Sequence, residues 1–454
     1  MNRFALLVVA AFAFAASACR TETSAELAPT QIPSHIPTWA YDQHFTQGQN
    51  ASPADVRRLL TYAMSGLNND KARSDCQGSG KCSSVFYFDP HLVYDSSQCP
   101  YSGDKQFLAA AQEDWFVHQT GYSDTAHRLR GTYTQTCKGV PIQIPVYAIN
   151  NSSPGVQRYY ASYLQQYANN WDYFELDDTA TTVTDQLYGP GGGFCKGMGT
   201  INGYCTQAQE ISDDRALENT HKNFVDALNY RDGRPMRFFY NSLKFGSNGA
   251  RLSLLSTSQR MVGTICENCI VNAGAFRPDM YAKVLDAMAA VSRDKSKHFV
   301  ELNTGKSPAG SDDQVAQRLA TTAVAWLGLS GNQIVVWPNL EFNTNNLAVW
   351  PEDAIYPAGP LQTMSSNNSD LSVGSSVWRR EFRSCYMNGS SIGPCAAVLN
   401  GSISPVVPSA SWFRSGFHHA VTLRGGDALS GGSVDLTSAP VGAVAPGRAA
   451  LLVR

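Results

Sequence analysis

The stretch Trp171-Asp172-Tyr173-Phe174-Glu175-Leu176-Asp177-Asp178 leads a short apolar run directly into two consecutive acids. Aromatic and aliphatic residues in a run of this length, followed by polar residues, are typical of a buried strand. Similar runs occur on both sides of it, and amphipathic stretches with helical spacing separate several of them. This alternation predicts an α/β domain with a parallel sheet.

The strands are expected at Val85–Asp89, Trp115–His118, Gln143–Ile149, Tyr173–Asp177, Met236–Asn241, Met261–Glu267, Phe299–Asn303 and Gln333–Trp337. Helices are expected at Gly155–Ala168, Ala208–Asn229, Pro278–Ser292 and Asp312–Leu327. The last helix follows Ser311 and has Gln314 three residues on, which forms a capping box. Strand and helix units over about 250 residues match a (β/α)₈ TIM barrel. An open doubly wound sheet is the alternative, although no glycine-rich dinucleotide fingerprint follows an early strand.

Different patterns flank this barrel region, which we place at residues 51–374. Residues 19–50 are polar and contain proline, which is typical of a linker. A short helix at Pro53–Ser65 with Ser52 as its cap is expected to follow. After Trp350 the helical period disappears, and short runs separated by Gly, Ser and Pro predict a small all-β domain, of the β-sandwich type, at residues 375–454.

The N-terminus has the pattern of a secretory signal peptide over residues 1–18. Arg3 precedes an apolar run, Phe4–Ala15, which is shorter than the ~20 residues of a membrane-spanning helix. The segment Ala16-Ser17-Ala18-Cys19 resembles the bacterial lipobox, with alanine where leucine is usual. It predicts a lipid anchor on Cys19 and export to the bacterial cell envelope, periplasmic or at the cell surface. An ordinary cleavage site beside a chance cysteine is the alternative.

The cysteine count agrees with such an anchor. The chain has 11 cysteines, an odd number, and without Cys19 the remainder can pair completely. Export favours disulfides, and neighbours in sequence form the couples Cys76 with Cys82, Cys99 with Cys137, Cys195 with Cys205, Cys266 with Cys269, and Cys385 with Cys395. The Cys266 and Cys269 pair also has the spacing of a redox or zinc motif, but no second C-x-x-C or H-x-x-x-H accompanies it.

Charge and motifs exclude several classes of function. A formal net charge of −2 and an isoelectric point near 6.5 give no basic footprint for nucleic acid. No serine lies in a G-x-S-x-G elbow, which disfavours serine hydrolase chemistry. No cofactor is expected, and no cluster with metal-ligand spacing is present among the residues expected at the strand ends.

In a TIM barrel the active site lies at the carboxyl ends of the strands, so polar residues there are candidates for binding and catalysis. Acids and amides bind sugar hydroxyls, and an indole packs against a pyranose ring. The expected strand ends contribute Asp89, His118, Asn150, Asp177, Asp178, Asn241, Glu267, Glu301, Asn303 and Trp337. This composition predicts a carbohydrate site.

Cleavage of a glycosidic bond usually requires two carboxyl groups. We expect Asp177 to be the nucleophile or base, with Asp178 orienting it, because only one of two neighbours in a strand can face the barrel axis. We expect Glu267 to be the general acid, held stiffly between Cys266 and Cys269, and Glu301 to be its substitute. The other strand-end residues, Asp89, His118, Asn150, Asn241, Asn303 and Trp337, are expected to contact the substrate.

Three stretches resemble a largely uncharacterised group of bacterial glycoside hydrolases of the barrel type, related in style to endo-polygalactosaminidase-like and α-amylase-like barrels. Asp114–His118 with Gly121 is similar to the family's early "D-W-hydrophobic" strand. Trp171–Asp178 is similar to its "Y-D-G-hydrophobic-F-L-D-D" strand, with the glycine replaced near Tyr173. Trp378–Phe382 followed by Ala397–Asn400 is similar to its "Y-R-R-x-F … V-L-V-N" entry to an all-β module. The resemblance implies that the catalytic acid is Asp177 or Asp178.

The sequence therefore predicts an exported glycoside hydrolase that acts on a polysaccharide or oligosaccharide and is attached to the membrane by its lipid anchor. A non-catalytic carbohydrate-binding lipoprotein on a barrel scaffold is the main alternative, because fold alone does not establish function. A thiol oxidoreductase that uses Cys266 and Cys269 is a further alternative.

Overall fold

The structure is a computed structural model. It describes residues 36–41, 62–65, 70–79, 82–90, 92–96, 102–118, 122–137, 140–151, 153–177, 225–241, 258–303, 311–329, 334–337, 350–365, 367–425 and 432–454. The predicted signal peptide, Cys19, Asp178, Cys99, Cys195, Cys205 and most of the expected helix Ala208–Asn229 lie outside these ranges, so they remain predictions.

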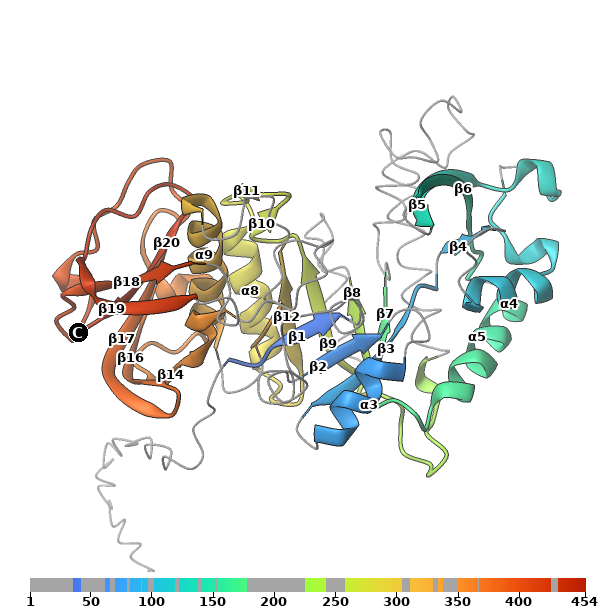
Figure 1. The fold of residues 1–454 in the computed structure, drawn as a ribbon, viewed down its shortest axis with the longest axis horizontal. Coiled ribbons are helices and arrows are strands. Elements are labelled where there is room, and N and C mark those ends of the chain that lie inside the picture. Colours follow the sequence, from blue (N-terminus) through green and yellow to red (C-terminus); the bar gives the residue numbers. More distant parts are fainter. Residues whose placement is uncertain are drawn as a thin grey trace, which may run out of the picture.

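An eight-stranded parallel sheet forms the centre of the molecule, in the order β1-β2-β3-β7-β8-β9-β12-β13 (Figure 1). The sheet curls until its edge strands meet at one parallel bridge between Thr38 and Val336, where the Val336 N–H donates to the Pro37 carbonyl over 2.9 Å. The strands are β1 Trp39–Tyr41, β2 Tyr62–Ser65, β3 Ser83–Phe88, β7 Tyr173–Leu176, β8 Phe238–Asn241, β9 Met261–Glu267, β12 His298–Leu302 and β13 Ile334–Trp337.

Six of the predicted strands are thus in the sheet, and the other two predicted segments are not part of it. Trp115–His118 is a 3₁₀ helix, η2 Glu113–Trp115, followed by two isolated bridges. Gln143–Ile149 overlaps β6 Val140–Ala148, which pairs antiparallel with β5 Arg130–Cys137 and β4 Leu92–Tyr94 in a separate sheet. Buried and more exposed side chains largely alternate along β6, as in a strand that is covered on one face only. Strands of a covered parallel sheet are buried on both faces, so β6 does not fit the central sheet.

The two remaining places in the sheet belong to β1 and β2, which the sequence analysis missed. Ile36 and Trp39 are fully buried, so the predicted linker over residues 19–50 includes residues of the sheet. The predicted helix Pro53–Ser65 ends in β2. Both strands are short, and a run of three or four residues gives little periodic signal.

Side chains on the two faces of the curled sheet form separate cores. The inner face is filled by a compact cluster that includes Trp39, Tyr62, Val85, Phe239 and Val300. The Trp39 ring lies 5.3 Å from that of Tyr62 and 5.0 Å from that of Phe239, centre to centre. The outer face packs against helices.

Helices α3 Asp70–Ser79, α4 Ser102–Ala110, α5 Pro154–Tyr167, α8 Tyr281–Ser292 and α9 Asp312–Gly328 connect the strands. The predicted helices at Gly155–Ala168, Pro278–Ser292 and Asp312–Leu327 are confirmed as α5, α8 and α9, and the Ser311 hydroxyl caps α9 by accepting the Gln314 N–H. Short 3₁₀ helices are η3 Thr125–His127, η5 Pro351–Ala354, η6 Asn368–Leu371 and η7 Ala410–Trp412. Among the described residues, none of the helices is long and apolar enough to cross a bilayer.

The C-terminal region forms one antiparallel sheet in the order β14-β16-β17-β20-β18-β19, with β15 beside β16. Its strands are β14 Ile355–Pro360, β15 Ser372–Gly374, β16 Val377–Met387, β17 Ser390–Asn400, β18 His419–Arg424, β19 Ser433–Pro440 and β20 Ala449–Val453. The expected β-sandwich is a single sheet over the described residues, because α9 covers one of its faces (Figure 1). It also begins earlier than residue 375, at β14.

Buried charges join α9 to the C-terminal sheet and to η5, which precedes it. The Arg318 guanidinium on α9 donates to both carboxylate oxygens of Glu352, at 2.7 and 2.5 Å, and both side chains are fully buried. Arg380 on β16 donates to the carbonyls of Leu327 and Leu329 at the end of α9, each over 2.7 Å. Carbonyls at a helix C-terminus lack partners within the helix, so this contact satisfies them.

Disulfides join Cys76 to Cys82, Cys266 to Cys269 and Cys385 to Cys395, as the local spacing predicted. A small hairpin, β10 Val271–Asn272 with β11 Ala275–Phe276, follows the second of these.

Candidate active site

Three adjacent strands carry polar side chains at the same edge of the parallel sheet. Asp177 directly follows β7, Asn241 ends β8 and Glu267 ends β9. The strands are neighbours and run parallel, so their carboxyl ends lie together. Asp177 and Glu267, which are 90 residues apart in the chain, therefore lie on opposite sides of a single amide.

The Asn241 amide binds both carboxylates. Its Nδ2 donates to Oδ1 of Asp177 over 2.7 Å and to Oε2 of Glu267 over 3.0 Å. An amide nitrogen carries two hydrogens at an angle of about 120°, so ideal, linear bonds of these lengths would place the two accepting oxygens about 5 Å apart. The opposite amide orientation would direct the carbonyl oxygen at two carboxylates, so the network fixes the side chain as described.

Tyr87 is a site residue that the sequence analysis missed. Its hydroxyl donates to Oδ2 of Asp177 over 2.5 Å, and its ring packs against the inner-face cluster. Burial, together with the negative charge of Asp177, raises the pKa of Tyr87 well above its usual value. The phenol therefore keeps its proton and acts as a hydrogen-bond donor to this carboxylate. Alternation along β3 could have found it, because Tyr87 shares a face with Val85.

A disulfide and side-chain hydrogen bonds stabilise the turn after Glu267. The Cys266–Cys269 disulfide closes it, and Asn268 occupies the left-handed region with φ 58°. Oδ1 of Asn303 accepts the N–H groups of Ile270 and Val271, both over 2.9 Å. This bracing fixes the backbone from which Glu267 extends.

Glu301, expected as the substitute acid, and Asn303, expected as a substrate contact, are both fully buried, and Glu301 lies on the face of the sheet opposite to that of Glu267. Glu301 is 0% exposed, and its Oε1 accepts from Nδ2 of Asn303 over 2.8 Å. The same Nδ2 lies 3.3 Å from the Thr321 hydroxyl on α9. Burial raises the pKa of Glu301 well above its usual value. The pair belongs to the packing between sheet and helix.

His118 and Asn150 lie beside the separate β4-β6-β5 sheet, because the strands on which they were placed are not in the parallel sheet. Nε2 of His118 lies 2.8 Å from Oε1 of Glu113, whose carboxylate also binds the Arg128 guanidinium. That guanidinium is the main cause that lowers the pKa of Glu113 to about 2. Asn150 donates to the Asp114 carbonyl over 3.0 Å. These contacts hold the η2 segment in place.

The remaining predicted residues divide as follows. Asp89 is next to the site at the end of β3, where Oδ1 accepts the Leu92 N–H over 3.2 Å. The backbone of Trp337 pairs with Leu302 in the parallel sheet. Glu175 was not predicted, but it lies two residues before Asp177, is 2% exposed and faces the sheet interior beside Tyr173. Within the described ranges, no group of His, Cys, Asp and Glu is arranged to hold a metal ion.

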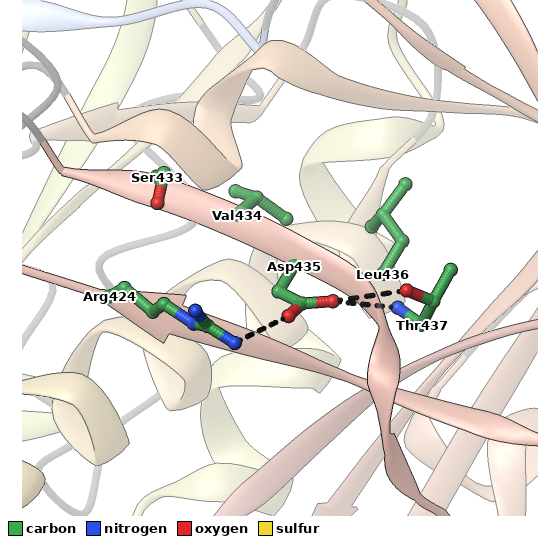
Figure 2. A pocket seen from close by; sticks show the side chains of 6 residues that line it. All are labelled: Arg424, Ser433, Val434, Asp435, Leu436 and Thr437. Atoms are coloured by element: carbon green, nitrogen blue, oxygen red, sulfur yellow. Dashed lines mark hydrogen bonds and ion pairs between the residues drawn. The ribbon is translucent and has the colours of Figure 1, made fainter.

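A surface pocket occurs elsewhere, on the β18–β19 hairpin of the C-terminal sheet (Figure 2). It is lined by Arg424, Ser433, Val434, Asp435, Leu436 and Thr437. Its centre is occupied by an ion pair between Arg424 and Asp435, 2.9 Å apart, and Oδ1 of Asp435 accepts the Thr437 N–H. These polar groups satisfy one another, and we assign the candidate site to the strand ends instead.

The sequence matches no protein-family model and no curated protein. Among solved structures, Aspergillus fumigatus Ega3 in complex with galactosamine is similar, with a TM-score of 0.37 and 13% identity over 68% of this chain and 92% of that one. Trehalose-6-phosphate hydrolase from Bacillus licheniformis has a TM-score of 0.45 and 7% identity over 93% and 99%. A GH30 endoxylanase from Clostridium papyrosolvens C71 has a TM-score of 0.37 and 8% identity over 93% and 97%.

Proposed function

We propose that this protein is a glycoside hydrolase that cleaves a polysaccharide or oligosaccharide with Asp177 and Glu267. The observation that carries the proposal is the single Asn241 amide that donates to both carboxylates. Two carboxyl groups close together at one edge of the sheet are what hydrolysis of a glycosidic bond requires. We further infer that the curled sheet is a (β/α)₈ barrel, whose strand ends are the usual place for catalysis.

The hydrogen bonds favour different roles for the two acids. Asp177 accepts from Tyr87 on one oxygen and from Asn241 on the other, at 2.5 and 2.7 Å. Glu267 accepts from Asn241 at 3.0 Å and from Nδ2 of Asn268 at only 3.4 Å. Donors stabilise the ionised form of a carboxyl group, so the more strongly bonded Asp177 suits the nucleophile. Glu267 suits the acid that protonates the leaving oxygen.

The separation of the carboxylates supports a retaining mechanism. Retaining enzymes have carboxyl groups about 5–5.5 Å apart, whereas inverting enzymes need about 6.5–9.5 Å to admit a water molecule. The amide geometry gives about 5 Å. In this mechanism Asp177 attacks the anomeric carbon while Glu267 protonates the departing oxygen. Glu267 then deprotonates a water molecule that releases the sugar from Asp177.

The test uses Asp177→Asn, which keeps the size of the side chain and removes its charge. We expect release of reducing ends from a panel of bacterial, plant and fungal polysaccharides to fall at least about 10³-fold, while binding of the same glycan persists. Asp172→Asn is the matched control. Its carboxylate lies at the start of β7, where it accepts from the N–H and the hydroxyl of Ser84 at 2.8 and 2.9 Å. We expect this variant to retain the wild-type turnover number.

Two outcomes contradict the proposal. If Asp177→Asn retains turnover, the carboxylate is not the nucleophile. If the wild-type protein binds glycans but releases no reducing ends from any of them, a non-catalytic carbohydrate-binding protein is favoured.

We also propose that the protein is exported and anchored through a lipid on Cys19. Metabolic labelling with a fatty-acid analogue should modify the wild type and leave Cys19→Ser unlabelled. Labelling of both proteins alike would refute the anchor.

A further inference from the structure

The Tyr87 hydroxyl differs from the Asn241 amide because it donates to Asp177 and not to Glu267. It donates to Oδ2 of Asp177 over 2.5 Å, whereas the Asn241 amide is shared between Asp177 and Glu267. Tyr87 extends from β3, which pairs directly with β7. A change at Tyr87 should therefore reach one of the two acids and leave the other.

We propose that Tyr87 is a positioning residue that keeps Asp177 ionised and holds its second oxygen, Oδ1, in place beside Asn241 at the sugar-facing edge. This inference rests on the proposed function. In the reaction, the Tyr87 proton stays on the phenol. The hydroxyl donates a hydrogen bond to Oδ2 of Asp177 before attack, and it keeps this bond while Asp177 is esterified through Oδ1. The residue makes no bond to substrate.

The surroundings of Asp177 show why such a donor is useful. Among the described residues, the ionisable groups near Asp177 are Tyr87, which donates to it, Asp89 directly after β3, Glu175 two residues before it in the chain and Glu267 across Asn241. Three of these are acids, and like charges disfavour ionisation of a further carboxyl group. The hydroxyl of Tyr87 and the amide of Asn241 act in the opposite direction.

Inner-face packing fixes the position of the phenol. The Tyr87 ring lies against the cluster that contains Val85, Phe239 and Ile265. Register places Tyr87 opposite Glu175 on β7, and the Asp177 N–H continues the ladder by donating to the Phe88 carbonyl over 2.8 Å. The hydroxyl and the carboxylate therefore approach each other from rigid, hydrogen-bonded strands rather than from loops.

The test is the pH profile of kcat/KM for Tyr87→Phe, which removes only the hydroxyl. Loss of a donor to the ionised form raises the pKa of Asp177, so the acidic limb should move up by about one pH unit. The alkaline limb, which reports Glu267, should remain in place. Asn241→Leu, which removes the shared donor, should move both limbs.

Tyr160→Phe is the matched control for loss of a buried phenol. The Tyr160 hydroxyl donates to the Pro90 carbonyl over 3.0 Å, close to the site but bonded to neither acid. We expect its acidic limb to coincide with that of the wild type. If the acidic limb of Tyr87→Phe stays in place, or moves no further than that of Tyr160→Phe, the proposal is wrong.

A second measurement does not depend on turnover. The side-chain carboxyl resonance of ¹³C-labelled Asp177, assigned by its absence from Asp177→Asn, should titrate at higher pH in Tyr87→Phe than in the wild type. If Tyr87→Phe does not fold, the ¹³Cζ shift of Tyr87 in the wild type should titrate in step with Asp177, and independence of the two would refute the proposal. A shift in the Asp177 titration without any hydrolysis would refute the hydrolase and retain the Tyr87 contact.

Discussion

Glu267 and Glu301 lie on adjacent strands and look alike in sequence, since each is an acid near the end of an apolar run. In the sheet Glu301 is opposite Cys266, and Glu267 is opposite Leu302. This offset of one residue places the two carboxyl groups on opposite faces, because successive side chains in a strand alternate. Glu267 shares the Asn241 amide with Asp177, whereas Glu301 is enclosed between sheet and helices and binds Asn303. The face of the sheet to which the side chain points, rather than the type of residue, therefore distinguishes the candidate catalyst Glu267 from the packing residue Glu301.

The largest expected difference between the two faces is in turnover. Glu267→Gln removes a general acid, and we expect kcat to fall by about 10²–10⁴-fold. Glu301→Gln should leave kcat within about twofold, because glutamine resembles the protonated form that burial favours at this position. Initial rates of reducing-end release for the two purified variants provide the measurement. Equal losses in both would remove the distinction between the faces.

A smaller effect, on stability, is expected at Asn303. Asn303→Ala leaves the buried N–H groups of Ile270 and Val271 without their acceptor. Each buried group left unsatisfied costs about 1–3 kcal/mol, so the loss of the acceptor for two of them should lower the free energy of unfolding by roughly 2–6 kcal/mol. Urea unfolding monitored by circular dichroism measures this. Asn150→Ala serves as the comparison. The hydrogen bond from its side-chain amide to the Asp114 carbonyl is exposed and should contribute about 1 kcal/mol or less to the free energy of unfolding. A loss at Asn303 no larger than that at Asn150 would contradict the bracing role.

The smallest expected effect is a pH dependence of stability from Glu301. Its pKa is raised in the folded protein, so the folded state holds the proton more tightly than the unfolded chain does. The stabilisation is complete below about pH 4.3, the usual pKa of glutamate, and is lost as the pH rises toward the folded value. The wild type should therefore lose unfolding free energy relative to Glu301→Gln between pH 5 and pH 8. Parallel urea titrations at both pH values test this, and a constant difference between the two proteins would refute it.

The sequence predicted the part of the fold in which strands are long and separated by helices. Apolar runs at Met261–Glu267 and Phe299–Asn303, with capped or amphipathic helices between strands, recur in the structure as β9, β12, α8 and α9. Short strands were missed, because β1 and β2 have only three and four residues. Their places were given to Gln143–Ile149, which pairs antiparallel in the β4-β6-β5 sheet, and to Trp115–His118, which is the end of a 3₁₀ helix followed by isolated bridges.

For the candidate site, the sequence indicated three strand-end residues that the structure brings together, but it did not indicate Tyr87, which donates a hydrogen bond to one of them. Asp177, Asn241 and Glu267 follow apolar runs that indicate where each strand ends, so the sequence indicates them. Tyr87 lies within such a run and resembles a core aromatic. Its role depends on the pairing of β3 with β7, which are far apart in the chain and adjacent in the sheet. Glu301 and Asn303 were assigned to the site because they are close to the end of a strand. The prediction did not consider that successive side chains in a strand point to opposite faces of the sheet.

The separation of the two acids can be tested through the stereochemistry of the product. The polysaccharide from which the wild type releases reducing ends is hydrolysed inside an NMR tube, and the anomeric proton of the first product is followed before mutarotation. Carboxylate oxygens about 5 Å apart around the Asn241 amide predict that the product first has the same anomeric configuration as the bond that was cleaved. First appearance of the opposite anomer would mean that a water molecule attacks directly, and would contradict Asp177 as the nucleophile.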